Sequence, residues 1–449
     1  MQYDLIIIGS GPAGYVGAVR AAKHGMKTAV IEKEASLGGT CLNWGCIPTK
    51  TLLKSAKVIH AIQDAEKFGI HLDGKMSFDF SKIMQRKEKV VKRIVKGVDY
   101  LMKTNKVDVI RGEASFVDPK TVKTSDGNFS AQNILIATGA QPARPPIPGL
   151  DSPNVLTSRE ILSLKACPQS LVVIGAGVIG MEFASFFNAL GVKVTVIEML
   201  DEVLPMIDSE IAALFKRQID KEGITFHLSS KVTNVEHGKV FFTNQTGDQQ
   251  AVEAETVLLA IGTVPNLNGL NLDRVGVRVE KQAIVTDAQM RTNIPGIYAA
   301  GDVNGVWMLA HKASREAEVA IETMAGEEAH IRYRAIPSCI YTSPEIATVG
   351  LSEKNAKDRG IPFRAAKYDL VANGRFLGET DGERGLVKAI VGKEHGELLG
   401  LHVIAPYASE IITVGTQGIE MEMLVKEFDE IVFPHPTICE AIRETILSA

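Results

Sequence analysis

The sequence contains the same long pattern twice, and this repeat constrains the fold more than any other feature. In residues 3–32 an apolar run meets Gly9, Gly11 and Gly14, a helical stretch follows, and a second apolar run ends in Glu32. A short strand, a glycine-rich turn, a helix and a second strand in this order are typical of one dinucleotide-binding βαβ unit.

The second copy occupies residues 171–198 and contains Gly175, Gly177 and Gly180, with Glu198 as its final acid. In both copies the acid lies 23 positions after the first glycine. The first glycine makes the tight turn, the second lets the backbone approach a pyrophosphate, and the third lets helix and strand pack closely. One such motif is weak evidence, but two in full context predict two dinucleotide sites.

The acid of each unit can accept hydrogen bonds from the ribose hydroxyls of an adenosine. Met199 and Leu200 follow Glu198, and no arginine is placed there to hold a 2′-phosphate. This favours NAD over NADP in the second unit. The alternative is that Glu198 is only a solvated acid at the end of a strand.

A chain of 449 residues is too long for one ordinary hydrophobic core, so we expect several domains. Apolar strand-like runs that end in glycine or proline, at 134–149, 257–266 and 296–303, indicate the boundaries. From about residue 336 the glycine motifs stop, and we expect an α+β segment from there on. We expect a first dinucleotide domain (1–143), a second (144–266), a central return segment (267–336) and a C-terminal domain (337–449).

The composition excludes several classes of protein. Apolar residues make up 45% and charged residues 23%, as in ordinary globular proteins, and the formal net charge is −4 with scattered basic residues. This gives no electrostatic footprint for nucleic acid or an anionic membrane. The first residues do not resemble a signal peptide, and no apolar run reaches the roughly 20 residues of a membrane span. We expect the protein in the cytoplasm, or in an organelle after loss of a presequence.

The stretch GGTCLNWGCIPTK places Cys41 and Cys46 close together in a chain that has only five cysteines. A zinc site would need about two further ligands, and no second cysteine pair or histidine cluster follows. A structural bridge would close a loop of about six residues, worth about 2 kcal/mol against nearly 5 for about 100 residues. A redox pair fits better, because a thiolate near a helix N-terminus is stabilised and its pKa lowered. A flavin on the first unit and a nicotinamide on the second could then exchange electrons with the disulfide.

Four further motifs carry a resemblance to a known family: GDV at 301–303, MLAHKA at 308–313, YTSPEIATVG at 341–350 and HPTICE at 435–440. With the cysteine segment, they make the full chain similar to the pyridine nucleotide–disulfide oxidoreductases, and most similar to the class I branch that oxidises dihydrolipoamide. The chain lacks the basic residues by which glutathione reductases bind NADPH and the terminal cysteine pair of mercuric reductases. The resemblance implies an α/β fold with two Rossmann-like domains and a C-terminal α+β dimerisation domain.

The resemblance also implies the cofactor sites. The first glycine motif and Glu32 would hold the ADP part of FAD, Asp302 its ribityl chain, and the stretch 308–311 would pass beside the flavin. The FAD set is Gly9, Gly11, Gly14, Glu32, Lys50, Ala114, Thr138, Gly139, Asp302, Met308, Leu309, Ala310 and His311. The NAD set is Gly175, Gly177, Gly180, Glu182, Glu198, Val232 and Gly262. No resident metal is expected.

In the family pattern the two cysteines differ in role. Cys46 would lie against the flavin ring and form a charge-transfer complex with it, while Cys41 would exchange with the substrate. Lys50 and Glu182 match an ion pair beside the reactive flavin nitrogen, where a charge stabilises electron density on the reduced ring.

His435 is the candidate base. Reduced lipoamide is a dithiol of high thiol pKa, so a base must take its proton before it attacks a disulfide. Histidine titrates in the right range, and Glu440 can orient its ring. A single histidine is more often structural, but its place in HPTICE favours this role. In the family this histidine reaches the cysteines of the other subunit, which implies a homodimer with shared active sites.

Some positions depart from the family pattern. Phe433 stands where many relatives have a second histidine, and Thr263 where many have an arginine, which leaves nicotinamide handling open. Cys167, Cys339 and Cys439 are interpreted as packed or idle thiols.

The functional prediction is NAD⁺-dependent oxidation of a protein-bound dihydrolipoyl group, for a 2-oxo acid dehydrogenase complex or the glycine cleavage system. One alternative is a related NAD(P)H-dependent reductase of another disulfide or of a metal ion. A non-catalytic flavoprotein scaffold is an alternative of a different class.

Overall fold

The computed structural model describes residues 2–449, which form two compact units. The first unit consists of Met1–Thr51, Ser81–Ala143 and Gly262–Arg332. The second consists of Leu52–Phe80, Arg144–Ile261 and Tyr333–Ala449. Each unit combines stretches that are far apart in the sequence. The four-part domain division expected from the sequence stays a prediction.

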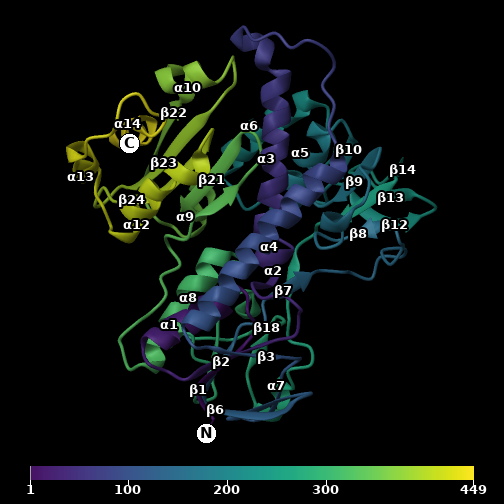
Figure 1. Cartoon of the computed structure of the whole chain (residues 1–449). Helices are drawn as coiled ribbons and strands as arrows, with labels where there is room; N and C mark the ends of the chain where they lie inside the picture. The colour runs from purple at the N-terminus through teal and green to yellow at the C-terminus, as the bar shows by residue number, and fades with distance from the viewer. Residues whose placement is uncertain (1) are drawn as a thin grey trace. The chain divides into compact units, whose positions relative to one another are not determined.

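The first unit is built around a mainly parallel sheet (Figure 1). Its elements are β1 (Tyr3–Ile8), α1 (Pro12–Lys23), β2 (Thr28–Glu32), α2 (Gly39–Asn43), α4 (Phe80–Thr104), β3 (Asp108–Arg111), β4 (Ser115–Asp118), β5 (Thr121–Thr124), β6 (Gly127–Ile136), β7 (Ala140–Pro142), β16 (Thr263–Pro265), α7 (Leu272–Val275), β17 (Val279–Glu280), β18 (Ala283–Ile284), β19 (Ile297–Ala299), the 3-10 turn η4 (Asp302–Asn304) and α8 (Ala310–Met324). Helix α3 (Cys46–Gln63) begins in this unit and continues into the second.

The parallel part has the strand order β3-β2-β1-β6, and β19 pairs with β6. The other half of β6 pairs antiparallel with β5, and β5 with β4. Strands β1 and β2 are apolar runs with little alternation, as expected for strands covered on both faces. Helix α1 lies beside α8, and an ion pair of 2.7 Å between Arg20 and Glu322 joins them (Figure 1).

The second unit contains a sheet of the same plan. Its elements up to residue 261 are η1 (Ala65–Phe68), β8 (Val155–Leu156), η2 (Ile161–Ser163), β9 (Ser170–Ile174), α5 (Val178–Ala189), β10 (Lys193–Ile197), α6 (Ser209–Ile219), η3 (Asp220–Glu222), β11 (Thr225–His227), β12 (Lys231–Glu236), β13 (Lys239–Thr243), β14 (Gln249–Glu253) and β15 (Thr256–Leu259). The parallel order is β11-β10-β9-β15-β8, and β12, β13 and β14 form a separate antiparallel sheet. The repeat seen in the sequence is therefore a repeat of strand order.

The remainder of the second unit is an antiparallel sheet with helices. Its elements are β20 (Ser338–Ile340), β21 (Glu345–Gly350), α9 (Glu353–Asp358), β22 (Phe363–Asp369), η5 (Leu370–Ala372), α10 (Gly374–Glu379), β23 (Leu386–Gly392), β24 (Leu398–Ala405), α11 (Ala408–Ile411), α12 (Thr413–Glu420), α13 (Val425–Glu430) and α14 (Glu440–Leu447). The strand order is β20-β21-β24-β23-β22. Its core contains Phe376, Leu401 and Phe428. Together the three sheets confirm the predicted fold class.

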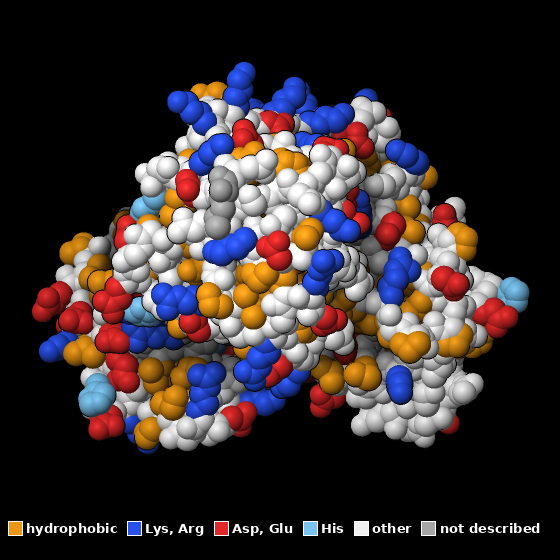
Figure 2. Space-filling view, turned by 90° about the horizontal axis from the view of Figure 1, so that it is seen from below, with side chains coloured by type: hydrophobic (Ala, Val, Ile, Leu, Met, Phe, Trp, Pro, Cys, Tyr) orange, Lys and Arg blue, Asp and Glu red, His pale blue; other side chains and the backbone are white. Residues whose placement is uncertain are grey.

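The surface offers little further guidance to function. On the face that Figure 2 shows, acidic and basic side chains are interspersed with apolar ones. Among the described residues, no helix combines the length and apolar character needed to cross a membrane.

Candidate active site

The first glycine turn has the geometry that its sequence pattern predicts. Gly9 follows β1 with a φ of +100°, and a Cβ there would collide with the carbonyl oxygen of Ala137. A Cβ at Gly14 would collide with the carbonyl oxygen of Gly9. At Gly11, in contrast, the nearest atom to an added Cβ is 3.9 Å away, so open space remains in front of α1. A pyrophosphate fits this space, because the unpaired N–H groups and dipole of the helix N-terminus favour an anion.

Glu32, the last residue of β2, is held tightly beside this turn. Its carboxylate accepts hydrogen bonds from the Ser10 backbone N–H at 2.9 Å, the Ser10 hydroxyl at 2.5 Å and the Glu34 N–H at 2.8 Å. The residue is buried, so these donors compensate its desolvation. Sequence reasoning missed Ser10, although a hydroxyl residue between the first two glycines was the available signal.

The cysteine segment rests directly on the first glycine turn. The Gly38 N–H donates to the carbonyl and the hydroxyl oxygens of Ser10, both at 3.1 Å. A Cβ on Gly39 would lie 2.6 Å from the Cα of Gly11, so only glycine allows this approach. Helix α2 starts at this point, and the redox candidates are thereby attached to the nucleotide motif.

Cys41 lies in α2 and Cys46 is the first residue of α3. Neither cysteine is in a disulfide, and their side chains hydrogen-bond to each other. The pKa of the Cys41 thiol is raised, first by this hydrogen bond and then by burial and the charge of Cys46, while Lys50 opposes the shift. The sequence led us to expect a lowered pKa. For Cys41 that expectation is wrong for the reduced pair, because the hydrogen bond to Cys46 holds the proton and its loss would place a second negative charge beside Cys46.

Tyr15 of α1 is a neighbour of the pair that sequence reasoning missed. Burial raises the pKa of its phenol, and the nearby Cys41 and Cys46 raise it further. The signal was its place one residue after the third glycine, on the first turns of α1.

Asp302 begins η4, three residues after the end of β19, and the charges of a buried ion pair act on it. Lys312 and Glu316 are fully buried, their charged atoms are 3.1 Å apart, and Lys312 also donates to Asn304 at 3.2 Å. Burial raises the pKa of Asp302, the charge of Lys312 lowers it, and Glu316 raises it. Burial lowers the pKa of Lys312, against the opposite effects of Glu316 and Asp302.

The other candidates for the first site occupy the same unit. Ala310 and His311 are the first two residues of α8, Leu309 is its N-cap, and Met308 precedes the cap. The Thr263 hydroxyl donates to the Met308 sulfur at 2.6 Å. Thr138 and Asn266 exchange hydrogen bonds of 2.7 and 3.1 Å, next to Gly139, and Ala114 is buried in the core behind the sheet.

The second glycine turn repeats the first. Gly175 has a φ of +104°, and a Cβ there would lie 2.5 Å from the carbonyl oxygen of Ala260. A Cβ at Gly180 would collide with the Gly175 carbonyl oxygen, whereas at Gly177 it would meet nothing within 4 Å. The open place before α5 fits a second pyrophosphate.

Glu198 follows β10 as Glu32 ends β2. Its carboxylate accepts from the Ala176 N–H at 2.6 Å and from the Leu200 N–H at 2.8 Å. Through Ala176 the acid faces the glycine turn, and the two residues that follow it, Met199 and Leu200, are not basic, as suits NAD.

Three residues of the predicted NAD set lie outside the second glycine turn. Glu182 in α5 is buried and accepts from the Tyr341 N–H at 3.1 Å, within the second unit. Its pairing with Lys50 of the first unit stays a prediction. Val232 belongs to the core of the second unit, and Gly262 lies in the first unit, where its carbonyl accepts from Ala143.

His435 and Glu440 form a pair in the second unit. The Nδ1 of His435 is 3.0 Å from Glu440, whose other oxygen accepts from the Thr437 N–H at 2.8 Å. The pKa of Glu440 is lowered, chiefly by the Thr437 N–H and further by His435. A carboxylate only accepts hydrogen bonds, so Nδ1 carries the proton and the neutral ring has its lone pair on Nε2. The histidine side chain is 82% exposed, ready for proton exchange.

The remaining three cysteines lie outside the Cys41–Cys46 pair. Cys339 and Cys439 pack against the C-terminal core, and burial raises the pKa of Cys167 and of Cys439. Across residues 2–449, no group of three or more His, Cys, Asp and Glu side chains is arranged to hold a metal ion.

Comparisons with known proteins agree with this geometry. Residues 3–317 match the family described as pyridine nucleotide-disulphide oxidoreductase, and residues 336–446 match the dimerisation domain of the same family. The dihydrolipoyl dehydrogenase of Rhizobium etli is 40% identical, over 100% of this chain and 98% of the relative.

Solved structures extend the likeness to the fold. LpdA from Mycobacterium tuberculosis has a TM-score of 0.90 at 30% identity, covering 99% of both chains. The HOCl-induced flavoprotein disulfide reductase RclA from Escherichia coli has a TM-score of 0.87 at 29% identity, also over 99% of both chains. The structure has two glycine turns with their acids and a cysteine segment packed on the first turn, and the matches span the full chain. The chain therefore belongs to the pyridine nucleotide–disulphide oxidoreductase family and carries its dimerisation domain.

Proposed function

We propose that the protein oxidises protein-bound dihydrolipoamide to lipoamide with NAD⁺, using FAD and the Cys41–Cys46 pair. The observation that carries the proposal is the contact between the cysteine segment and the first glycine turn, which Gly38 and Gly39 make. This contact attaches a redox pair to a nucleotide site. The relative from Rhizobium etli, which this chain matches from end to end, is named a dihydrolipoyl dehydrogenase.

FAD fits the first unit and NAD the second. The space at Gly11 and the carboxylate of Glu32 suit the pyrophosphate and ribose of FAD, and Asp302 its ribityl chain. The space at Gly177 and the carboxylate of Glu198 suit the same groups of NAD. Bound FAD supplies two-electron transfer between the cysteine pair and the nicotinamide. The other members of the two sets remain proposed contacts.

The thiol chemistry is an exchange between the dithiol of the substrate and the disulfide of the enzyme. A thiolate of the dihydrolipoyl group attacks Cys41 of the oxidised pair, and Cys46 leaves as a thiolate. The second substrate thiol then attacks the mixed disulfide, which releases lipoyl disulfide and leaves the pair reduced. Two electrons and two protons pass to the enzyme, and NAD⁺ removes the two electrons as hydride while one proton returns to solvent.

His435 takes the proton of the attacking thiol at Nε2. Glu440 keeps Nδ1 protonated at 3.0 Å and stabilises the imidazolium that forms. The His435 side chain is 82% exposed in the single chain, which supports a site completed by a second copy of the chain. We therefore propose a homodimer in which the cysteine pair of one protomer faces His435 of the partner subunit.

The proposed substrate is the lipoylated arm of a 2-oxo acid dehydrogenase complex or of the glycine cleavage system. A protein-tethered dithiol calls for an accessible base, and His435 is 82% exposed. The corresponding location is the cytoplasm or an organelle matrix, where carrier proteins of this kind are found together with NAD⁺.

Steady-state assays with dihydrolipoamide and NAD⁺, set against glutathione disulfide and NADPH, test the proposal. We expect turnover only with the first pair, and an absence of dihydrolipoamide oxidation would contradict the proposal. His435→Gln should lower kcat by about 100-fold or more, as expected for loss of a general base. His395→Gln, which changes another exposed histidine, should leave kcat unchanged.

Anaerobic titration with NADH tests the cysteine pair separately. The wild-type holoenzyme should develop a long-wavelength thiolate–flavin band. Cys46→Ser should abolish the band while the protein keeps its flavin. Cys167→Ser, outside the pair, should retain it.

A second candidate function is reduction of another disulfide with NADH. It is favoured by the likeness to RclA, a flavoprotein disulfide reductase, over 99% of both chains. The same assays decide between the two, because such a reductase would consume NADH with a different disulfide and oxidise dihydrolipoamide poorly.

A further inference from the structure

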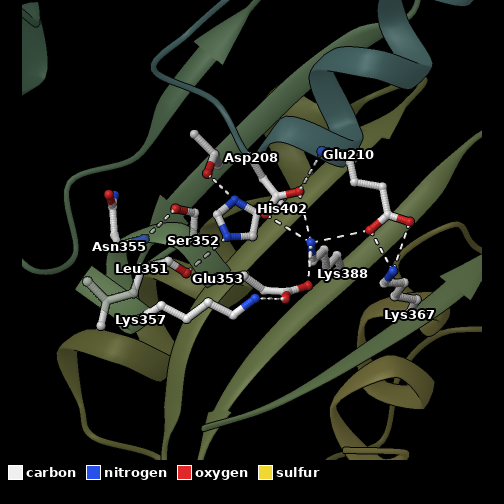
Figure 3. Close-up of polar contacts among 11 residues, drawn as sticks. Asp208, Glu210, Leu351, Ser352, Glu353, Asn355, Lys357, Lys367, Lys388 and His402 are labelled. Carbon is white, nitrogen blue, oxygen red and sulfur yellow. Dashed lines mark hydrogen bonds and ion pairs between the residues drawn. The ribbon is translucent and has the colours of Figure 1, made fainter. Parts of the chain in front are cut away.

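Lys388 is a buried lysine surrounded by carboxylates, and the mechanism proposed above does not use it. It is 3% exposed and lies in the middle of β23. Its Nζ donates to both oxygens of Asp208 at 3.0 Å, pairs with Glu353 at 2.8 Å and reaches Glu210 at 3.3 Å (Figure 3). Burial lowers the pKa of Lys388, but the contacts with Glu353 and Asp208 outweigh it and the pKa is raised. The ammonium is therefore charged at neutral pH.

The carboxylates come from two parts of the second unit. Asp208 is the N-cap of α6 and accepts from the Glu210 N–H at 3.1 Å, whereas Glu353 starts α9 in the C-terminal part. Asp208 is 2% exposed, so it depends on its partners for compensation of its charge. Two further lysines balance the negative charge of the glutamates: Lys367 pairs with Glu210 and Lys357 pairs with Glu353 (Figure 3).

Asp208 is also the end of the loop that crosses the second glycine turn. The loop, residues 199–208, leaves Glu198 with a hydrogen bond from the Leu200 N–H to that carboxylate at 2.8 Å. At its centre, the Leu204 N–H donates to the carbonyl of Ala176, between the first two glycines, at 3.0 Å. The loop is thus fastened at Glu198, at the turn and at Asp208.

The centre of this loop is strained and depends on its surroundings. Leu204 has a φ of +53°, a conformation that a branched side chain rarely adopts, and it is 1% exposed. The Ile207 N–H closes a short turn onto the Leu204 carbonyl at 2.9 Å, immediately before Asp208. A strained turn keeps its shape only while both of its ends are held.

We propose that Lys388 is a positioning residue for the dinucleotide site of the second unit. By holding Asp208, it keeps the 199–208 loop on the glycine turn and Glu198 in the orientation that receives the adenosine ribose. The inference rests on the proposed function only in assigning the dinucleotide to this turn. In this role Lys388 makes the C-terminal part of the unit, through β23, a determinant of the affinity for NAD.

A neighbouring polar group in the same sheet does not share this role. His402 of β24 donates through Nε2 to the Leu351 carbonyl at 3.0 Å, and burial lowers its pKa, so it is neutral. Its other nitrogen contacts the Thr348 hydroxyl. Lys388 is therefore the group that links the sheet to Asp208 by charge.

The test measures binding of ADP-ribose to the FAD-loaded enzyme by titration calorimetry. ADP-ribose carries the pyrophosphate and both riboses but no nicotinamide, so no electron transfer interferes. Lys388→Met should raise the dissociation constant by about 5- to 10-fold, the size of a typical coupling between sites. Lys388→Arg keeps the charge and should restore binding to within about twofold.

Glu353→Gln is the matched control, because it removes a carboxylate from the same lysine without touching Asp208 or the loop. It should lower the thermal stability yet leave ADP-ribose binding within about twofold of the wild type. Steady-state assays should show a raised KM for NAD⁺ with unchanged kcat for Lys388→Met, and FAD content should be unchanged in all variants.

Two results would overturn the inference: wild-type affinity for ADP-ribose in Lys388→Met, or equal losses in Lys388→Met and Glu353→Gln. If Lys388→Met does not fold, Asp208→Asn replaces it, since asparagine still caps α6 but weakens the ion pair. Wild-type affinity in that variant would equally overturn it. Failure of the wild type itself to bind ADP-ribose would instead contradict the proposed function.

Discussion

The two glycine turns of this protein are nearly the same in local geometry but differ in what lies on them. In both, a Cβ at the first glycine would run into a backbone carbonyl of the neighbouring strand end, at Ala137 in one and Ala260 in the other. In both, the acid at the end of the second strand accepts from the residue between the first two glycines, Ser10 or Ala176.

The chain also returns to the turn at the same point in both units. Gly38 and Leu204 each lie six positions after the acid, each has a positive φ, and each donates its N–H to the carbonyl between the glycines. After this point the two segments take different courses. Gly38 leads into the cysteine helix α2, while Leu204 leads to Asp208 and Lys388.

The comparison shows that one local device serves two purposes. In the first unit the segment that returns to the turn leads into the helix that contains Cys41. In the second unit it leads to Asp208, the N-cap of α6, which pairs with Lys388 of another sheet. Variants made in pairs, one in each unit, separate what the turns share from what is particular to each.

The largest effect is expected from the third glycine of each motif. Gly14→Ala and Gly180→Ala each place a Cβ on a backbone carbonyl oxygen. The overpacked turn should cost about 2–3 kcal/mol, and the affinity for the nucleotide at that turn should fall by about 30- to 100-fold. Gly14→Ala should be purified largely without flavin. Gly180→Ala should keep its flavin and lose NAD⁺-dependent turnover. Flavin absorbance and KM for NAD⁺ measure the two effects, and loss of flavin in Gly180→Ala would break the comparison.

A smaller effect is expected where the cysteine segment meets the turn. Gly38→Ala adds a Cβ 2.5 Å from Leu42 at a φ of +100°, and should lower the free energy of unfolding by about 2 kcal/mol. The displaced segment should also weaken the long-wavelength band on NADH addition. Gly25→Ala has a φ of +75° but nothing within 4 Å, so it should cost about 1 kcal/mol and leave the band intact. Equal effects of the two variants on the band would show that the contact with the turn is unimportant.

The smallest effect is expected from the residue between the first two glycines. Ser10→Ala removes the hydroxyl that donates to Glu32 and accepts from Gly38, and should lower the free energy of unfolding by about 1–2 kcal/mol in denaturant titrations. Ala176→Ser adds a hydroxyl beside Glu198 and should stay within about 1 kcal/mol of the wild type, because the new group finds an acceptor. A larger loss in Ala176→Ser than in Ser10→Ala would contradict this difference between the turns.

Much of the fold and part of the site could be predicted from the sequence. The glycine spacing and the acid that follows depend only on local backbone geometry, so Gly9, Gly14, Gly175 and Gly180 could be assigned without coordinates. The start of α3 at Cys46 agrees with the expectation of a thiol near a helix N-terminus. The raised pKa of Cys41 could not be foreseen, because it depends on a contact between two side chains.

The sequence by itself determined that this chain has two nucleotide turns, since a requirement for glycine arises within a few residues of backbone. Only the tertiary structure decided which segments rest on those turns. Lys388 meets Asp208 across 180 positions, and nothing periodic in β23 marks that lysine as a partner. A buried charge selects its partner by where the fold places it, and that placement depends on the packing of distant sheets rather than on local pattern.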